Sequence, residues 1–302
     1  MPAPPASGPF LYRTALASGM TENALRGPRV QRLGHGVYAA ADLRIGIVES
    51  ITGALLVLPA DAVVTGVTAL HLYGVTIGDP LPVRAVTATR SQSRRAGVRL
   101  ARVSVLPPRR RRLATASAVW LAACVELDLV EAVSAADWLV HLRLVTLSGL
   151  LQAADAATSR GCRRARRAAA LARDGVESPR ESRLRMMAVL AGLPDPRCNV
   201  TLGNDVYAIG RVDMLFDAFR VILEYDGDWH RTDRDQWNTD LDRNDAFADL
   251  GFLTLRVTSA RMKRPREVVR RLHGLLVEHG YAGPAPTFGP QWCTLFEPLR
   301  RV

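Results

Sequence analysis

The stretch RVDMLFDAFRVILEYDGDWHRTDRDQWNTDLDRNDAFADLGFLTLRVT, residues 211–258, carries the pattern that decides the fold of the C-terminal part of the chain. It opens with two short apolar runs, residues 212–216 and 221–225, and the four residues between them suit a tight connection. Two such runs predict a β-hairpin. A helical pattern follows at residues 234–250, and residues 252–257 read as a further strand.

Three carboxylates lie on the predicted hairpin. Asp213 is near the start of its first strand, and Glu224 and Asp226 are at the end of its second. Because side chains alternate along a strand, Glu224 and Asp226 face the same way, and Asp213 joins them if the strands pair. Carboxylate oxygens that converge at a strand edge are the hard ligands that Mg²⁺ and Mn²⁺ prefer.

The order of motifs in this stretch resembles a known family. Asp213 is followed by EYDGxxH at residues 224–230, DxxR at 240–243 and GFxxLR at 251–256. This succession resembles nuclease-like domains of the PD-(D/E)XK superfamily that are related to the very-short-patch-repair endonucleases. The resemblance implies a restriction-endonuclease-like core with the element order αβββαβ.

The resemblance also implies roles for single residues. Asp213, Glu224 and Asp226 would bind Mg²⁺ or Mn²⁺, which activates water and stabilises charge on the scissile phosphate. The superfamily usually has a lysine two residues after the glutamate, where this chain has Asp226. His230 then becomes the acid–base or electrophilic helper. Arg243 would orient a carboxylate or contact phosphate, and a structural ion pair is the alternative.

A helix is predicted to start at Ser178. Ser178 can cap it, Pro179 suits its first position, and Glu181 can complete a capping box. In the nuclease superfamily the first core helix often carries an acid that faces the metal, and Glu181 matches that place. The sequence leaves both roles of Glu181 open.

Charge is distributed unevenly along the chain. The 302 residues carry a net charge of +11, and Lys263 is the one lysine among 40 basic residues. Residues 205–249 contain 12 acids and 5 arginines, a net of −7, so the remainder carries +18. An acidic centre in a basic protein suits metal-dependent cutting of a polyanion, and an arginine-rich solvated surface is the alternative.

The first segment, residues 1–80, is predicted to be a winged helix-turn-helix. A short helix is expected at residues 10–18 and a second after Thr21 as N-cap, with Val30 and Leu33 closing the helical unit before a strand at 37–40. This segment and the later run VTGVTALHLYGV at residues 64–75 resemble the AbiEi-like antitoxin family. The resemblance implies that three arginines contact DNA and that a histidine lies at the wing, namely Arg26, Arg29 and Arg32, and His35.

The middle segment, residues 81–175, is predicted to be mixed α/β. Strands are expected within residues 82–106 and helices within 116–157. Between them lie four consecutive arginines that form a candidate phosphate-facing patch, Arg109, Arg110, Arg111 and Arg112. A solvated loop is the alternative. The last segment, residues 176–302, is the nuclease-like one, and its proline-rich tail after Gly283 is expected to be irregular.

Composition narrows the class of protein. No apolar run approaches the roughly 20 residues of a membrane span. The N-terminus lacks the basic and apolar regions of a secretory signal. The four cysteines have neither the spacing of a zinc site nor a disulfide framework. These features favour a cytoplasmic protein without a membrane partner.

Two functions follow from the sequence. The first is a DNA-binding protein with a metal-dependent endonuclease-like C-terminal domain, an endodeoxyribonuclease that hydrolyses phosphodiester bonds. The second is an antitoxin-like transcriptional repressor with a catalytically inactive nuclease fold. A cognate toxin or a repair protein is a further candidate partner, and no oligomeric interface is legible. The predicted fold class is α+β in several domains.

Overall fold

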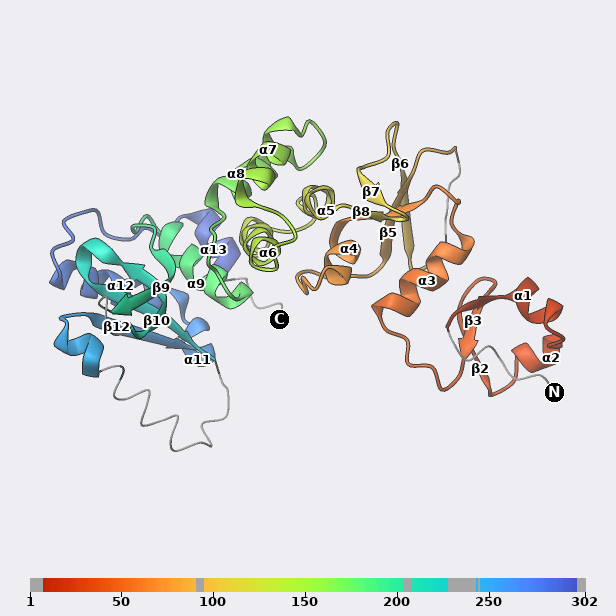
Figure 1. Ribbon diagram of the computed structural model, residues 1–302, viewed down its shortest axis with the longest axis horizontal. Helices are drawn as coiled ribbons and strands as arrows, with labels where there is room; N and C mark the ends of the chain where they lie inside the picture. Colours follow the sequence, from red (N-terminus) through yellow and green to blue (C-terminus); the bar gives the residue numbers. More distant parts are fainter. Residues whose placement is uncertain (1–7, 91–94, 204–207, 228–242, 244, 298–302) are drawn as a thin grey trace. The chain divides into compact units, whose positions relative to one another are not determined.

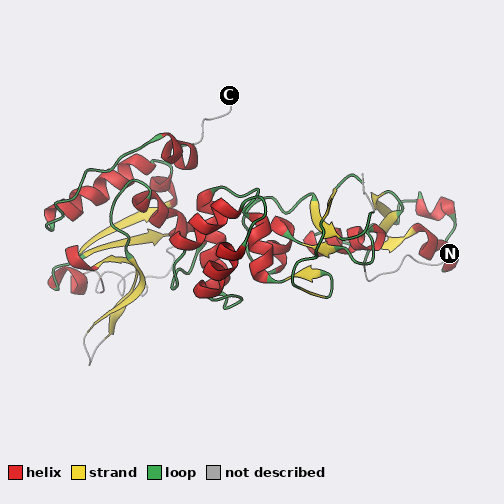
Figure 2. Cartoon of the chain, turned by 90° about the horizontal axis from the view of Figure 1, so that it is seen from above, coloured by secondary structure: helices red, strands yellow, loops and turns green. Residues whose placement is uncertain are grey.

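The computed structural model describes residues 8–90, 95–203, 208–227, 243 and 245–297 (Figure 1). The chain forms two compact units, and each combines two separate segments of sequence. Unit 1 contains residues 1–127 and 148–166, and unit 2 contains residues 128–147 and 167–302. Helices and strands occur in both units (Figure 2), which confirms the predicted mixture of α and β structure in a multidomain chain.

Unit 1 begins with a small three-stranded module. It consists of β1 (Phe10–Leu11), α1 (Tyr12–Ala17), α2 (Glu22–Leu25), β2 (Val30–Gly34) and β3 (Val37–Ala40), with strand order β1-β3-β2. Thr21 caps α2 as predicted, since its hydroxyl oxygen accepts from the Ala24 amide at 3.2 Å. Val30 and Leu33 lie on a strand and not on a helix, because β2 pairs antiparallel with β3 from Val30 onward.

The rest of unit 1 is a five-stranded sheet with helices. The sheet contains β4 (Val63–Val64), β5 (Val83–Thr87), β6 (Val98–Arg102), β7 (Arg109–Arg110) and β8 (Leu113–Ala114), in the order β6-β5-β4-β8-β7. The helices are α3 (Ile47–Val57), α4 (Gly66–Leu72), α5 (Ala116–Ala123), α7 (Leu147–Ala156) and the start of α8 (Cys162–Leu171). Strands at residues 83–87 and 98–102 confirm the prediction for this segment.

Unit 2 is built around a four-stranded sheet with the order β12-β11-β10-β9. Its strands are β9 (Arg197–Gly203), β10 (Ala208–Phe216), β11 (Val221–Asp226) and β12 (Leu253–Thr258). The pairs β9–β10 and β10–β11 are antiparallel, and β11 pairs parallel with β12. Phe247, from the helical residues 245–249 between β11 and β12, packs with Leu215 and Ile222 in the core.

Helices complete unit 2. They are α6 (Leu129–His141), α9 (Pro179–Val189), α11 (Ser259–Met262), α12 (Pro265–Glu278) and α13 (Pro290–Phe296). The tail after Gly283 is not irregular throughout, because α13 forms there and buries Trp292, whose indole N–H donates to the Met187 carbonyl at 3.0 Å. Among the helices that the structure describes, none has the length and apolar character needed to cross a bilayer.

Candidate functional site

The pairing of β10 with β11 brings two predicted carboxylates together. Met214 is opposite Leu223, so the next pair in the register places Asp213 opposite Glu224. Residues opposite each other in an antiparallel pair share a face of the sheet. Beyond this pair, the Tyr225 amide donates to Oδ2 of Asp213 at 2.8 Å. The tight connection that the sequence predicts at residues 217–220 holds this register, with a 3₁₀ turn at Asp217–Phe219 and Arg220 in the left-handed region at φ 48°.

Glu181 makes the predicted cap at the start of α9. Its amide donates to the Ser178 hydroxyl oxygen at 3.1 Å, and that hydroxyl donates to Oε1 of Glu181 at 2.7 Å. Its Oε2 accepts from the Glu177 amide at 3.0 Å, one residue before the position that the capping box predicts. The capping role is therefore present, and it does not exclude an electrostatic role of the same carboxylate.

That electrostatic role is visible at Asp213. Burial, together with the charges of Glu181 and Glu224, raises the pKa of Asp213 to about 7, against the opposing effects of the Tyr225 amide and Arg243. Carboxylates from α9, β10 and β11 thus act on one another. Such a group either keeps a proton near neutral pH or favours a cation beside it.

Glu224 is engaged by two arginines. Nη2 of Arg243 donates to its Oε1 at 3.0 Å and Nε of Arg256 donates to its Oε2 at 3.2 Å. Arg256 is the parallel neighbour of Glu224 on β12, and the Glu224 residue is 7% exposed. Of the two roles predicted for Arg243, the contact with a carboxylate is the one present in the structure.

The residues at this place fit a divalent cation in chemistry and only partly in arrangement. Asp213, Glu224 and Asp226 supply hard oxygen ligands, and Asp226 is half-buried two residues beyond Glu224 on the same strand. Across the part of the chain that the structure describes, no group of three or more His, Cys, Asp or Glu side chains is arranged to hold a metal ion. A cation at Glu224 would have to displace Arg243 or Arg256. His230 lies outside the described residues.

Of the predicted DNA contacts of the first segment, the structure brings Arg32 and His35 together, with 3.4 Å between Nη2 of Arg32 and Nδ1 of His35. Arg26 follows α2, Arg29 lies in the turn before β2, Arg32 is on β2 and His35 is in the β2–β3 turn, and all four are exposed. Arg26 forms a 3.9 Å ion pair with Glu22 at the surface. Arg32 donates to the Gly34 carbonyl at 3.2 Å. Arg29, Arg32 and His35 therefore lie on the β2–β3 hairpin or in the turn before it.

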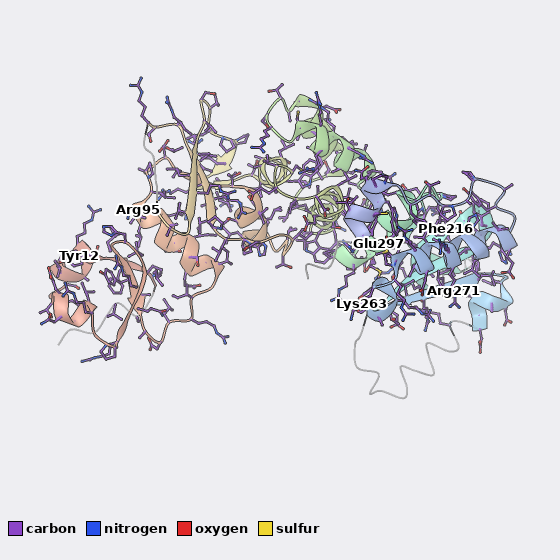
Figure 3. The ribbon with its side chains drawn as sticks, turned by 180° about the vertical axis from the view of Figure 1, so that it is seen from behind. Tyr12, Arg95, Phe216, Lys263, Arg271 and Glu297 are labelled. Carbon is purple, nitrogen blue, oxygen red and sulfur yellow. The ribbon has the colours of Figure 1, made fainter. Side chains whose placement is uncertain are left out.

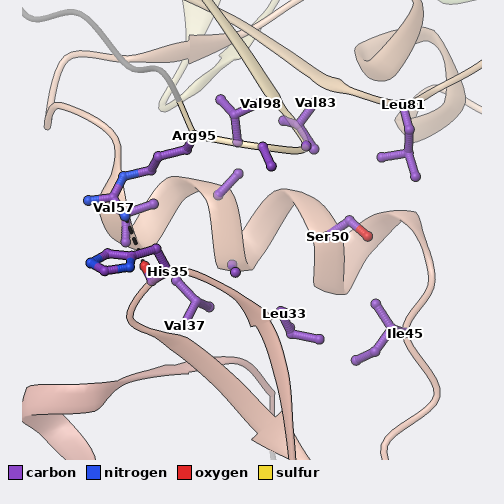
Figure 4. Close-up of a pocket in the computed structure, with 15 residues that line it drawn as sticks. Leu33, His35, Val37, Ile45, Ser50, Val57, Leu81, Val83, Arg95 and Val98 are labelled. Carbon is purple, nitrogen blue, oxygen red and sulfur yellow. Dashed lines mark hydrogen bonds between the residues drawn. The ribbon is translucent and has the colours of Figure 1, made fainter.

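His35 also lines a cavity of about 210 Å³ in unit 1 (Figure 4). The cavity lies between the β2–β3 hairpin, α3 and the ends of β5 and β6, and most of its lining is apolar. Nη1 of Arg95 donates to the His35 carbonyl at 2.8 Å, drawn as a dashed line in Figure 4. This bond ties the turn of the hairpin to the segment that precedes β6.

The four consecutive arginines do not share one environment. Arg109, Arg110 and Arg111 are exposed, and Arg111 has a φ of 54°. Arg112 turns inward and donates to three carbonyl oxygens around the end of α3, those of Leu55 at 2.8 Å, Pro59 at 2.5 Å and Ala62 at 3.0 Å. Burial lowers the pKa of the Arg112 guanidinium. Three of these arginines thus form the outward patch, and Arg112 serves the fold.

A buried ion pair in unit 2 has no signal in the sequence. Asp137 on α6 accepts from Nη2 of Arg185 on α9 at 3.2 Å, and both side chains are 1% exposed. The Asp137 carboxylate also accepts from the Ser182 hydroxyl and the Arg173 amide, both at 2.7 Å. The partners are 36 to 48 residues apart in sequence, so local patterns do not reveal them.

No protein-family model, no curated protein and no solved structure matches this chain. A proposal for the function of this chain therefore rests on the geometry and charge of the site.

Proposed function

We propose that the chain is a DNA-binding protein whose C-terminal unit is a metal-dependent endonuclease. The observation that carries the proposal is the group formed by Asp213, Glu224 and Glu181, which comes from two paired strands and a helix start. Burial, and after it the repulsion between these carboxylates, raises the pKa of Asp213 to about 7. Such an excess of negative charge favours binding of a divalent cation.

The residues have distinct roles in this proposal. Asp213 and Glu224, with Asp226, would hold Mg²⁺ or Mn²⁺, and the cation would supply activated water and charge neutralisation at the scissile phosphate. The Tyr225 amide fixes the Asp213 carboxylate through its 2.8 Å hydrogen bond. Arg243 and Arg256 form ion pairs with Glu224. His230 remains the proposed proton-transfer residue.

The order of elements supports the same function. From α9 to β12 unit 2 runs helix, three strands, a short helical stretch and a strand. This is the αβββαβ succession that the resemblance to the PD-(D/E)XK nucleases implies. The net positive charge outside residues 205–249 supports a polyanionic substrate, with Arg109, Arg110 and Arg111 exposed to meet it.

A second function is favoured by one observation at the same site. Both oxygens of Glu224 already accept hydrogen bonds from arginines, and Asp226 stands where the superfamily has its lysine. A site closed by ion pairs suits an antitoxin-like repressor that keeps the fold without the chemistry. Such a repressor would bind an operator, or a toxin, and leave DNA intact.

Plasmid cleavage separates the two functions. Purified protein is incubated with supercoiled plasmid and Mg²⁺ or Mn²⁺, alongside Asp213→Asn and Glu224→Gln. Nicking that requires metal and falls by about 100-fold or more in both variants supports the nuclease, since loss of one electrostatic stabiliser of a transition state acts on this scale. Asp217→Asn is the matched control, because Asp217 is an exposed acid in the same hairpin that pairs with Arg197 at 3.1 Å.

The contrary outcome is equally definite. Binding of DNA by the wild-type protein without cleavage under either metal, together with no heat of Mg²⁺ or Mn²⁺ binding in calorimetry, rejects the nuclease and favours the repressor. Circular dichroism of each variant verifies that a fall in activity does not come from unfolding.

A further inference from the structure

Unit 2 contains a groove of about 370 Å³ where β12 meets α11 and α12. Its floor is apolar, and its rim is formed by three arginines from α11, the start of α12 and the middle of α12. The residues of floor and rim are Leu255, Val257 and Val268, and Arg261, Arg264 and Arg271. Figure 3 labels Arg271, together with Lys263, which follows α11.

The arginines converge for a geometric reason. Arg264, Val268 and Arg271 are spaced by four and three residues at the start of α12, which places them on one face of the helix. Val268 is buried at the centre of this face, whereas Arg264 and Arg271 are exposed on either side of it. Arg261 approaches from α11, so three guanidinium groups surround one concave surface.

The positive charge of the groove is only partly balanced. Glu267 is the one acid among the described residues that line it, so three arginines and one glutamate leave a net charge of +2. Glu267 pairs with Arg264 at 3.6 Å, and both side chains are largely exposed, so water screens this pair strongly. Arg271 forms no ion pair with any residue that the structure describes.

The groove is connected with the acidic site through one residue of β12. Nη1 of Arg261 donates to the Arg256 carbonyl at 2.6 Å, while Nε of the same Arg256 donates to Glu224 at 3.2 Å. Leu255 and Val257 face the groove and Arg256 faces the acidic site, because side chains alternate along the strand. β12 is also the edge strand of its sheet. The groove and the acidic site therefore lie on opposite faces of the same edge strand.

We propose that this groove binds the phosphate backbone of the nucleic acid on one side of the cleavage site. The proposal rests on the proposed function, and it adds the surface that positions the substrate. Guanidinium groups bind phosphate oxygens through paired N–H donors, and such contacts give affinity without base specificity. Arg261, Arg264 and Arg271 are the residues that bind phosphate.

Adjacent arginines on α12 provide a matched test. Arg270 and Arg271 are both exposed, but Arg270 lies outside the groove, with its guanidinium 5.7 Å from the Phe288 ring centre. Full-length Arg271→Ala, Arg270→Ala and Arg264→Ala/Arg271→Ala are titrated against a fluorescein-labelled duplex of about three helical turns of DNA without metal. Fluorescence anisotropy gives Kd at several NaCl concentrations. Each variant's thermal unfolding is compared with that of the wild type.

The expected result is weaker phosphate binding by the groove variants alone. The double variant raises Kd by about tenfold or more near 0.1 M salt. The slope of log K against log salt is negative, and its magnitude falls by about 0.9 for each phosphate that is no longer neutralised. Arg271→Ala reduces the magnitude of this slope by the amount expected for one phosphate, and Arg270→Ala leaves the slope unchanged. Equal effects of Arg270→Ala and Arg271→Ala would overturn the proposal, because a solvated basic helix acts only through its total charge.

Failure of the nuclease and failure of the groove give different results. If the wild-type protein never cuts plasmid, but Arg271→Ala weakens DNA binding and Arg270→Ala does not, the groove is supported as a nucleic-acid surface and the nuclease is rejected. If the wild-type protein cuts plasmid and the double variant binds DNA with the same affinity and salt slope as the wild type, the groove is rejected and the nuclease is supported.

Discussion

At Asp213, burial and two neighbouring carboxylates act in the same direction on one proton. They raise the pKa from its ordinary value of 3.8 to about 7, although the Tyr225 amide and Arg243 oppose the shift. In the unfolded chain the group is ionised above about pH 4, whereas in the folded protein it keeps its proton to near neutrality. Folding of this unit is therefore linked to uptake of a proton between these two values.

This linkage predicts the pH dependence of stability. The contribution of Asp213 is fully present below about pH 4 and is lost as pH rises through about 7, because the folded state binds the proton more tightly. Asp213→Asn removes this decline, so the variant gains stability over the wild type from about pH 4 to about 7. The gain is at most a few kcal/mol, since each pKa unit corresponds to about 1.4 kcal/mol. Urea unfolding at several pH values measures it.

A control and a contrary result are available for Asp213→Asn. Asp217→Asn, at the exposed turn of the same hairpin, should follow the wild-type curve. If the difference in unfolding free energy between Asp213→Asn and the wild type is constant between about pH 4 and about 7, the carboxylate does not hold its proton in the folded protein.

Added Mg²⁺ should stabilise the wild type more at about pH 8 than at about pH 6, because binding of the cation requires the ionised carboxylates.

At the scale of single elements, local patterns account for most of what the sequence predicts. The apolar runs around residues 217–220 specify the β10–β11 hairpin, and Ser178 with Pro179 specifies the start of α9. The register of this hairpin, continued by one residue beyond Met214 and Leu223, aligns Asp213 with Glu224. These features depend on neighbours within a few residues, so periodicity, capping and turn chemistry are sufficient.

The features that the sequence does not predict depend on distant parts of the chain. Arg112 reads as one of four solvated arginines, but it binds carbonyls 50 to 57 residues earlier in the chain. Residues 30–34 form a strand because β3 pairs with them. The late proline-rich segment forms α13 because Trp292 finds a buried site against α9. Tertiary contact decides each of these, and the local residues do not encode it.

The buried pair between α6 and α9 gives a prediction for these two elements. Asp137→Ala leaves Asp195, at 3.3 Å, as the remaining acidic partner of the buried Arg185, and the loss of one member of a buried pair costs at most about 3–5 kcal/mol. Asp137→Leu/Arg185→Met replaces both charges by apolar groups and should recover most of that stability. Urea unfolding followed by tryptophan fluorescence gives the free energies. A double variant as unstable as Asp137→Ala would show that the pair has a role other than mutual neutralisation.

At the scale of the whole molecule, the chain crosses between its two units more than once. Composition divides the sequence into residues 1–80, 81–175 and 176–302, whereas the compact units place residues 128–147 with the C-terminal sheet. The segment contains α6, whose inner side buries Val133, Ala136 and Asp137. A fragment cut by composition at residue 176 thus lacks a helix that belongs to unit 2.

Fragment stability tests this division of the chain. Residues 128–302 retain α6 on α9, whereas residues 176–302 expose the apolar side of α9 and leave Arg185 without Asp137. The apolar side of α9 that α6 covers returns to water in the shorter fragment, which costs about 25 cal/mol per Å² of apolar area. The shorter fragment should therefore unfold at a clearly lower urea concentration, or fail to fold. Equal urea midpoints for the two fragments would mean that α6 is dispensable and that the site on β10 and β11 needs only the sequence after residue 176.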